Sequence, residues 1–188
     1  MTYDLKNVFY LDTTVKIDNS TTGAGSAQLD LSAYIDPIAR GRTKGTGLAI
    51  YKTHFTVIRN DAGSPAPQAN EAGIMSFGLC AGLGVGDNAT GTVALSDTLL
   101  QATNNLLITQ GMYYGPASFP GATAFPEMGV VPSEKVPYVV VRDNVCLVYD
   151  VDATNQFTAD MDLAVRMECA QVSLDQATLN QLLRTQTV

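Results

Sequence analysis

The sequence predicts an all-β protein built as an antiparallel β-sandwich, and two observations carry this prediction. The first is a group of β-branched and aromatic runs between residues 137 and 172, in which residues 163–170 alternate strictly between apolar and polar. Side chains of a strand point to opposite faces with a period of two, so this alternation indicates a half-buried strand. The second is the punctuation of a 188-residue chain by Gly- and Pro-rich stretches, which is typical of one sandwich domain.

Three predicted strands near the C-terminus organise the rest of the chain. Residues 137–142 and 145–149 are rich in valine and tyrosine, and Asp143-Asn144 between them tolerates the positive φ angles of a two-residue turn. We therefore expect these two runs to pair as a hairpin, with residues 163–172 as the third strand. An isolated hairpin is marginal in water, so the remaining residues must supply a covering layer.

The first half of the chain predicts two further strands. Residues 7–18 alternate, residues 19–26 have the composition of a flexible loop, and residues 28–39 fit either a short strand or a helical turn. Residues 48–59 predict a long strand, with His54 on the side opposite its apolar residues. The residues expected to share one face of these two strands are Phe9, Leu11, Thr13, Val15 and Ile17 in the first, and Ala49, Tyr51, Thr53, Phe55 and Val57 in the second.

The middle of the chain predicts three more strands and a short helix. Residues 74–81 are apolar on both faces and predict a central strand, and residues 90–95 and 106–114 predict two others. Between these two, Ser96-Asp97-Thr98 resembles a helix N-cap followed by one or two apolar turns.

The last sixteen residues predict a C-terminal helix, so the expected division is a sandwich over residues 1–172 and a helix or tail over residues 173–188. Ser173 with Gln176 fits a capping box. A helix of this length is too short to be stable alone, so it must dock either on its own domain or on another copy. Its apolar residues, spaced for one face and candidates for subunit contact, are Leu174, Leu179, Leu182 and Leu183.

Residues 115–136 contain four prolines and several glycines, which predicts a long loop without a regular element. Long loops in compact domains commonly make functional contacts. Four of its apolar residues are candidates for contact with a neighbouring subunit, although a loop folded over its own sandwich remains the alternative: Phe119, Phe125, Met128 and Val131.

The composition limits the partners. Charged residues make up only 15% of the chain and the net charge is −7. Interface cores are depleted in charge, so the low content favours a surface covered by copies or partners, with a compact Thr-, Ser- and Asn-rich domain as the alternative. The acidic balance disfavours strong direct nucleic-acid binding. One glycine-rich stretch carries Arg40, Arg42 and Lys44, which predict either a contact with nucleic acid or an acidic partner, or a solvated turn.

No catalytic site and no cofactor are predicted. His54 is the single histidine and no nucleophile motif accompanies it, so the sequence predicts a protein that is not an enzyme. Asp150 and Asp152 resemble the start of a calcium loop, but Asn155 stands where a glycine is needed, which leaves them weak metal candidates. Cys80, Cys146 and Cys169 lie in apolar runs and predict buried free thiols. The sequence contains no run of some twenty apolar residues, so no membrane span is predicted. Residues 1–6 lack the pattern of a signal peptide.

About eight predicted strands joined by loops of unequal length favour a jelly roll with a short internal helix and a C-terminal helix. In this pattern, from residue 8 through residues 48–59 and 138–141 to 163–172, the chain resembles a single jelly-roll capsid protein of an icosahedral virus. The resemblance implies a structural, self-assembling shell protein, made in the host cytoplasm and located in the virion, whose partners are its own copies and other capsid proteins. One departure is that residues 1–7 do not form an Arg-rich genome-binding arm.

Two functions of other classes compete with the shell protein. A ligand- or carbohydrate-binding β-sandwich module is the first alternative; the chain has no tryptophan to stack on sugars, although its eight tyrosines can substitute. A sandwich enzyme that uses carboxylates is the second. Large particles that form with concentration would support the shell, whereas a monomer with a ligand pocket would support the module.

Overall fold

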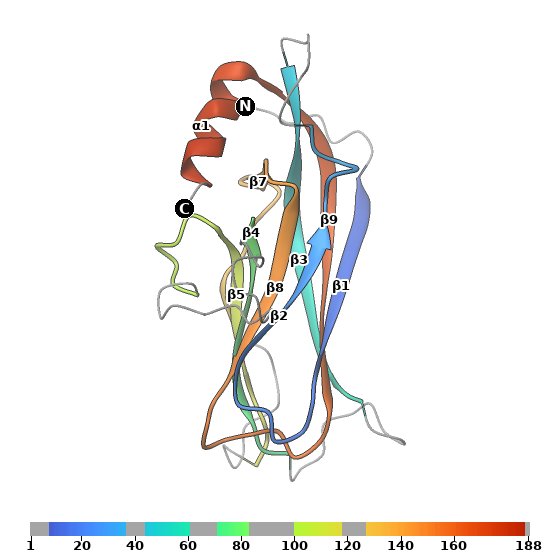
Figure 1. Cartoon of the computed structure of the whole chain (residues 1–188), viewed down its shortest axis with the longest axis vertical. Coiled ribbons are helices and arrows are strands. Elements are labelled where there is room, and N and C mark those ends of the chain that lie inside the picture. The colour runs from blue at the N-terminus through green and yellow to red at the C-terminus, as the bar shows by residue number, and fades with distance from the viewer. Residues whose placement is uncertain (1–7, 37–43, 61–70, 83–99, 118–126, 187–188) are drawn as a thin grey trace, which may run out of the picture.

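The computed structural model describes residues 8–36, 44–60, 71–82, 100–117 and 127–186. Within them the chain forms nine strands and one helix (Figure 1). The elements are β1 (Phe9–Ile17), β2 (Gly23–Asp30), β3 (Lys44–Arg59), β4 (Ile74–Ala81), β5 (Leu107–Tyr114), β6 (Glu127–Val130), β7 (Tyr138–Val140), β8 (Asn144–Val151), β9 (Met161–Asp175) and α1 (Gln176–Thr185).

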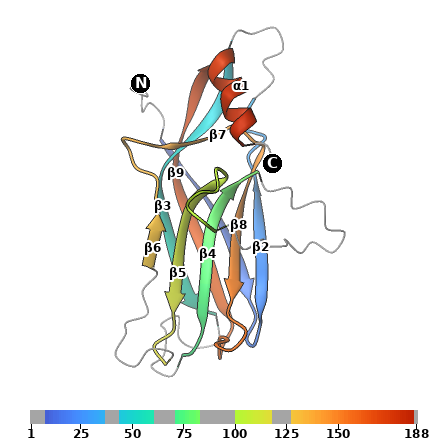
Figure 2. The same cartoon turned by 90° about the vertical axis from the view of Figure 1, so that its left-hand side faces the viewer.

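The strands form two antiparallel sheets that pack face to face, and their order is that of a jelly roll (Figures 1 and 2). One sheet has the order β1-β9-β3-β7 and the other β2-β8-β4-β5-β6. The first strand thus pairs with the last, β2 with β8, β3 with β7 and β4 with β5, which nests the strand pairs inside one another. β6 adds a short outer strand to β5. The predicted antiparallel jelly-roll sandwich is confirmed.

The core lies between the sheets and is lined by alternating residues, as the period of two requires. Ile17 of β1, and Leu163 and Met167 of β9, are fully buried, while their even-numbered neighbours face away. Burying a side chain of this size contributes roughly 1.5–3 kcal/mol relative to leaving it exposed. The predicted inner face of β1 is confirmed, because Phe9, Leu11, Val15 and Ile17 all pack into this core.

The predicted hairpin between residues 137–142 and 145–149 is wrong. β7 pairs with β3, where Leu48 lies opposite Val140, whereas β8 pairs with β2 and β4 in the other sheet. Residues 141–143 therefore carry the chain from one sheet to the other. Both strands are largely buried, and placing them in different sheets gives each a neighbouring strand and a share of the core.

Three other local predictions are corrected. β2 begins at Gly23, inside the loop expected at residues 19–26, and β6 lies inside the stretch expected to have no regular element. Residues 100–106 form turns, so they do not continue the predicted internal helix; its start at residues 96–99 and the predicted strand at residues 90–95 lie outside the described residues. Gly25 lets β2 lie against Tyr149 of β8, since a Cβ at this position would overlap the Tyr149 side chain.

A bulge in β3 overturns the prediction that one face holds every odd residue from 49 to 57. The register against β9 shifts between Ile50 and Lys52, so Tyr51 is the extra residue. Leu48 and Ile50 face the main core before the bulge, and Phe55 and Val57 face it afterwards. Ala49 and Tyr51 belong instead to a second apolar cluster.

α1 covers this second cluster at one end of the sandwich (Figure 1). The expected boundary between residues 172 and 173 is displaced, because β9 runs through Asp175. The helix cap is Asp175 and not the predicted Ser173: its side chain accepts a hydrogen bond of 2.8 Å from the Thr178 N–H. Leu179 is fully buried in the cluster, so the helix docks on its own domain. Across the described residues, no helix is long and apolar enough to span a membrane.

Candidate functional site

The basic stretch is only partly described. Lys44 is the exposed first residue of β3 and lies opposite Asp175 of β9, so its nearest strand partner is a carboxylate of its own chain. Arg40 and Arg42 lie outside the described residues.

The predicted subunit contacts divide into two groups. Leu174 and Leu179 are 4% and 0% exposed, so they are corrected to internal packing residues that α1 and β9 bury against each other. Leu182 and Leu183 are partly buried against the same cluster. Val131 is 51% exposed. Met128 lies in β6, where the structure describes its backbone only. Phe119 and Phe125 lie outside the described residues.

The segment that joins β6 to β7 presents apolar side chains to solvent and projects from the sandwich (Figure 2). Val136 is 74% exposed and Val131 51%. The turn between them is held by backbone hydrogen bonds in both directions between Ser133 and Val136, at 3.2 Å and 3.1 Å. This turn therefore carries two exposed valines, and we call it the valine turn.

Gln186 closes the β7 edge of its sheet. Its side chain is buried, with Oε1 accepting from the Val141 N–H at 3.2 Å and Nε2 donating to the Val139 carbonyl at 2.6 Å. Its own carbonyl accepts from Arg142 Nη1 at 2.9 Å. One amide side chain thus occupies the backbone groups that a further strand would use. This role could not be predicted from the sequence, because a single glutamine carries no spacing signal.

The outward side of β1, β9 and β3 carries a polar surface, and the sheet register arranges it in rows. Asp12, Arg166 and His54 form one row, and Thr14, Ala164 and Thr56 the next. Ala164 is small and forms the floor of a shallow, open depression. The residues around this depression, called the polar depression below, are Tyr10, Asp12, Thr14, His54, Thr56, Ala164, Val165, Arg166 and Glu168.

The polar depression combines paired charges with an exposed ring. His54 Nε2 lies 2.8 Å from Glu168 Oε1, and the Arg166 guanidinium lies 6.0 Å from the centroid of the Tyr10 ring. Tyr10 is 61% exposed, so much of this aromatic residue is accessible to a ligand. Guanidinium, carboxylate and hydroxyl groups at these positions offer hydrogen bonds of both senses to a polar ligand. His54 therefore lies beside the polar depression and is paired with the Glu168 carboxylate.

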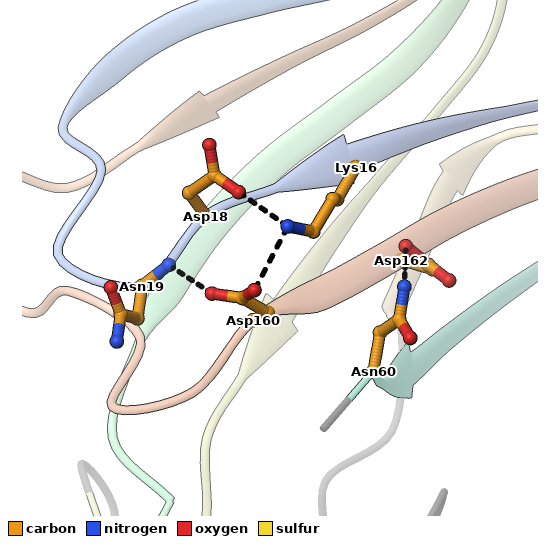
Figure 3. A network of polar contacts seen from close by, with 6 residues as sticks. All are labelled: Lys16, Asp18, Asn19, Asn60, Asp160 and Asp162. Atoms are coloured by element: carbon orange, nitrogen blue, oxygen red, sulfur yellow. Dashed lines mark hydrogen bonds and ion pairs between the residues drawn. The ribbon is translucent and has the colours of Figure 1, made fainter. Parts of the chain in front are cut away.

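At the other end of the polar surface, an ionic network ties β1 to the start of β9 (Figure 3). Lys16 Nζ lies 2.7 Å from Asp18 and 2.9 Å from Asp160, and these hydrogen bonds raise the pKa of the lysine. The bond from Lys16 and a second from the Asn19 N–H lower the pKa of Asp160. Asn60 donates to Asp162 at 3.0 Å. The network fixes the corner where the sheet ends.

The loop that contains the weak metal candidate Asp152 is an Asx turn. Asp152 Oδ1 accepts four hydrogen bonds from Thr154 and Asn155, at 2.6–2.9 Å, and these bonds lower its pKa to about 2. The oxygen that would bind a cation therefore already satisfies donors of its own turn. Asp150 lies in β8, and the described residues contain no group of three or more His, Cys, Asp or Glu able to hold a metal ion.

The three cysteines are buried free thiols, as predicted. Burial raises the pKa of Cys80 and of Cys169 to about 12, and it also raises the pKa of Cys146. A thiolate is the reactive form, so these side chains are chemically quiet within the fold.

One buried charge was missed by the sequence analysis. Glu71 is fully buried before β4, where Oε1 accepts from the Thr158 N–H at 2.9 Å and hydroxyl at 2.7 Å. Arg59 Nη1 lies 3.6 Å from its other oxygen. A buried carboxylate must be paired to be tolerated, and Glu71 thereby ties the β8–β9 connection to the end of β3 at one end of the sandwich. No local pattern distinguishes it from a loop glutamate.

Comparison with known proteins identifies no family. No family matches the chain, and no curated protein matches it. A solved structure similar to it is that of human polyomavirus 12 VP1 in complex with 3'-sialyllactosamine, with 9% identity over 90% of this chain and 100% of that chain and a TM-score of 0.43. At this level the similarity adds nothing to the strand order, which by itself defines the chain as a jelly-roll protein.

Proposed function

We propose that this protein is a non-enzymatic structural protein that assembles with copies of itself into a shell, as the capsid protein of an icosahedral virus does. The observation that carries the proposal is the complete nested strand order of a jelly roll, an architecture used by viral capsid domains. Because one fold hosts many functions, the surface must supply the rest of the argument.

Two surface properties support assembly. Only 15% of the residues are charged, which matches surfaces that are covered in an assembly. The valine turn adds two exposed apolar side chains, Val131 and Val136, which can contact a neighbouring subunit. The expected partners of the protein are other copies of itself and other shell proteins, and its expected location is the virion.

The test is the size of the purified protein, measured by light scattering and sedimentation over a range of concentration and salt, with electron microscopy of any large fraction. Closed particles or rings are expected. The double variant Val131→Asp, Val136→Asp should reduce their formation at unchanged thermal stability. Gln181→Glu, which adds negative charge on the exposed side of α1, is the matched control and should assemble normally. A chain that stays monomeric under every condition would overturn the proposal.

The polar depression favours a second candidate function, a module that binds a carbohydrate or another polar ligand. The exposed Tyr10 ring beside Arg166 and the His54–Glu168 pair is the specific observation. Glycan binding that is abolished by Tyr10→Ser and weakened by Arg166→Ala, in a protein that remains monomeric, would replace the shell proposal. Glycan binding by assembled particles would make the two functions compatible.

A further inference from the structure

Within the described residues the two sheets have four edge strands, β1, β7, β2 and β6, and these are unequally protected against pairing with another strand. Proteins blunt exposed edges with charged side chains, short strands or covering groups, because an open edge is a template for another strand. β1 carries Asp12 and Lys16, and β6 has 4 residues. β7 has 3 residues, and Gln186 occupies the Val139 carbonyl within it and the Val141 N–H just after it.

Among the described residues, β2 has none of these protections. It is 8 residues long, it pairs with β8 without a register shift, and it contains no lysine, arginine or proline. Its side chains from Gly23 to Ala27 are glycine, alanine or serine, and its single charge, Asp30, stands at the far end. β2 lies at the margin of its sheet (Figure 2).

The backbone groups that β2 turns outward follow from the register. Leu31 donates its N–H to the Asp143 carbonyl at 2.6 Å, and Gly82 donates to the Asn144 carbonyl at 2.9 Å. Hydrogen-bonded and non-bonded pairs alternate in an antiparallel ladder, so Ala27 and Leu29 bond to β8. The N–H and C=O groups of Ala24, Ser26 and Gln28 therefore point away from β8. In the described part of the chain no hydrogen bond is made to these outward groups.

We propose that β2 pairs antiparallel with β2 of a second copy, so that two sandwiches share one continuous sheet across a two-fold axis. The inference rests on the proposed self-assembly and names one surface that makes it. A foreign peptide is selected by pockets for its side chains, and the small residues of β2 offer none. An identical strand needs no pocket, because its own glycine, alanine and serine residues fit against this flat edge.

The charges on the β2 edge are compatible with a second copy of β2 as its partner. A two-fold pair centred on Ala27 places outward groups opposite outward groups, with Ser26 facing Gln28 and Ala24 facing Asp30 of the second copy. The two Asp30 carboxylates then lie six residues apart along the pair, roughly 20 Å at about 3.4 Å per residue. That separation exceeds the screening length of about 8–10 Å at physiological salt, so self-pairing does not bring the two Asp30 carboxylates together.

The first test is the mass of the full chain by sedimentation over a range of concentration, at a salt concentration where large particles are absent. The wild type should reach twice the monomer mass of 19.9 kDa. Gln28→Lys places a protecting charge on the edge and should abolish the dimer at unchanged melting temperature. Thr14→Lys on β1 is the matched control and should leave the dimer intact.

Oxidative cross-linking tests the register. The Cα atoms of a non-bonded pair lie about 4.5 Å apart, within the disulfide range of about 4.4–6.8 Å, so Ala27→Cys should form a covalent dimer. Ala24→Cys should not, because its two copies are separated by about 20 Å in this pair. The wild type, whose cysteines are buried, should not cross-link either.

The outcomes separate this inference from the proposed function. Large particles that form equally well with Gln28→Lys, together with no Ala27→Cys dimer, would overturn the β2 pair and leave assembly standing. A β2 dimer that never grows larger would overturn the shell and leave the pair standing. A monomer at all concentrations, or a β2 edge occupied by a different protein, would overturn the pairing of copies.

Discussion

The two halves of β9 present the same side of one strand to very different surroundings. From Asp162 to Glu168 its even-numbered residues are polar or small and form the open polar surface, whereas Ala170, Val172 and Leu174 are apolar and lie beneath α1. The strand itself continues through this change, but the buried residues switch from odd-numbered positions, through Cys169, to even-numbered positions from Ala170 onward. Strand periodicity therefore decides only which residues share a side, and the element packed on that side decides whether they are buried.

The largest loss of stability is expected from disrupting the half of β9 that α1 covers. Leu179→Ala removes the fully buried side chain by which α1 docks, and it should lower the free energy of unfolding by about 2–5 kcal/mol. Denaturant unfolding measures this change. Asn180→Ala, on the exposed side of the same helix, should change it by no more than about 0.5 kcal/mol. Equal effects of the two substitutions would mean that α1 is not docked as described.

A smaller loss is expected at the edge that Gln186 closes. Gln186→Ala leaves the Val139 carbonyl and the Val141 N–H without their partner, which should cost about 1–3 kcal/mol. The control Gln181→Ala removes an amide that is exposed on α1 and should be nearly neutral. Hydrogen exchange of the Val141 N–H offers a local measurement. Its exchange rate should increase in Gln186→Ala but not in Gln181→Ala.

The open half should tolerate change. Glu168→Gln removes the charge that faces His54, and because both side chains are partly exposed the expected loss of stability is at most about 1 kcal/mol. Thermal unfolding at low and high salt measures it, with less difference between the two proteins at high salt. A loss as large as that of Leu179→Ala would contradict the description of this surface as solvated.

The smallest effect is expected from pH. Hydrogen bonds from Thr178 lower the pKa of the Asp175 carboxyl at the cap of α1, and Thr154 and Asn155 lower that of Asp152, away from α1, to about 2. A lowered folded-state pKa adds stability that is fully present above the ordinary value of 3.8 and is lost as pH falls through the folded value. Melting temperature should therefore fall between pH 5 and pH 2 in a scan at about half-unit steps.

Two substitutions separate the contributions of Asp175 and Asp152 to this pH dependence. Asn caps helices as well as Asp does but carries no charge, so Asp175→Asn should keep α1 and flatten the acid slope. Asp152→Asn should flatten its lowest part, near the folded pKa of about 2. A slope that is unchanged in both variants would assign the acid sensitivity to other carboxylates.

Much of the architecture was predictable, because it depends on local patterns. The alternation in residues 163–170 predicted β9, the odd residues of β1 predicted its buried face, and the apolar run at residues 74–81 predicted a central strand. The apolar surroundings of the cysteines also predicted their burial. The polar depression was not predicted, since its residues come from three strands and meet only through the register of the sheet.

The sequence by itself determined the fold class and the alternation of buried and exposed residues, because hydrophobic periodicity is a local property of the chain. Only the tertiary structure decided that residues 138–140 and 144–151 enter different sheets, that Tyr51 shifts the phase of β3, and that a strand forms where Gly25 admits Tyr149. Each of these depends on a partner far away in sequence, and no local pattern specifies which distant strand, ring or amide will fill the space beside a residue.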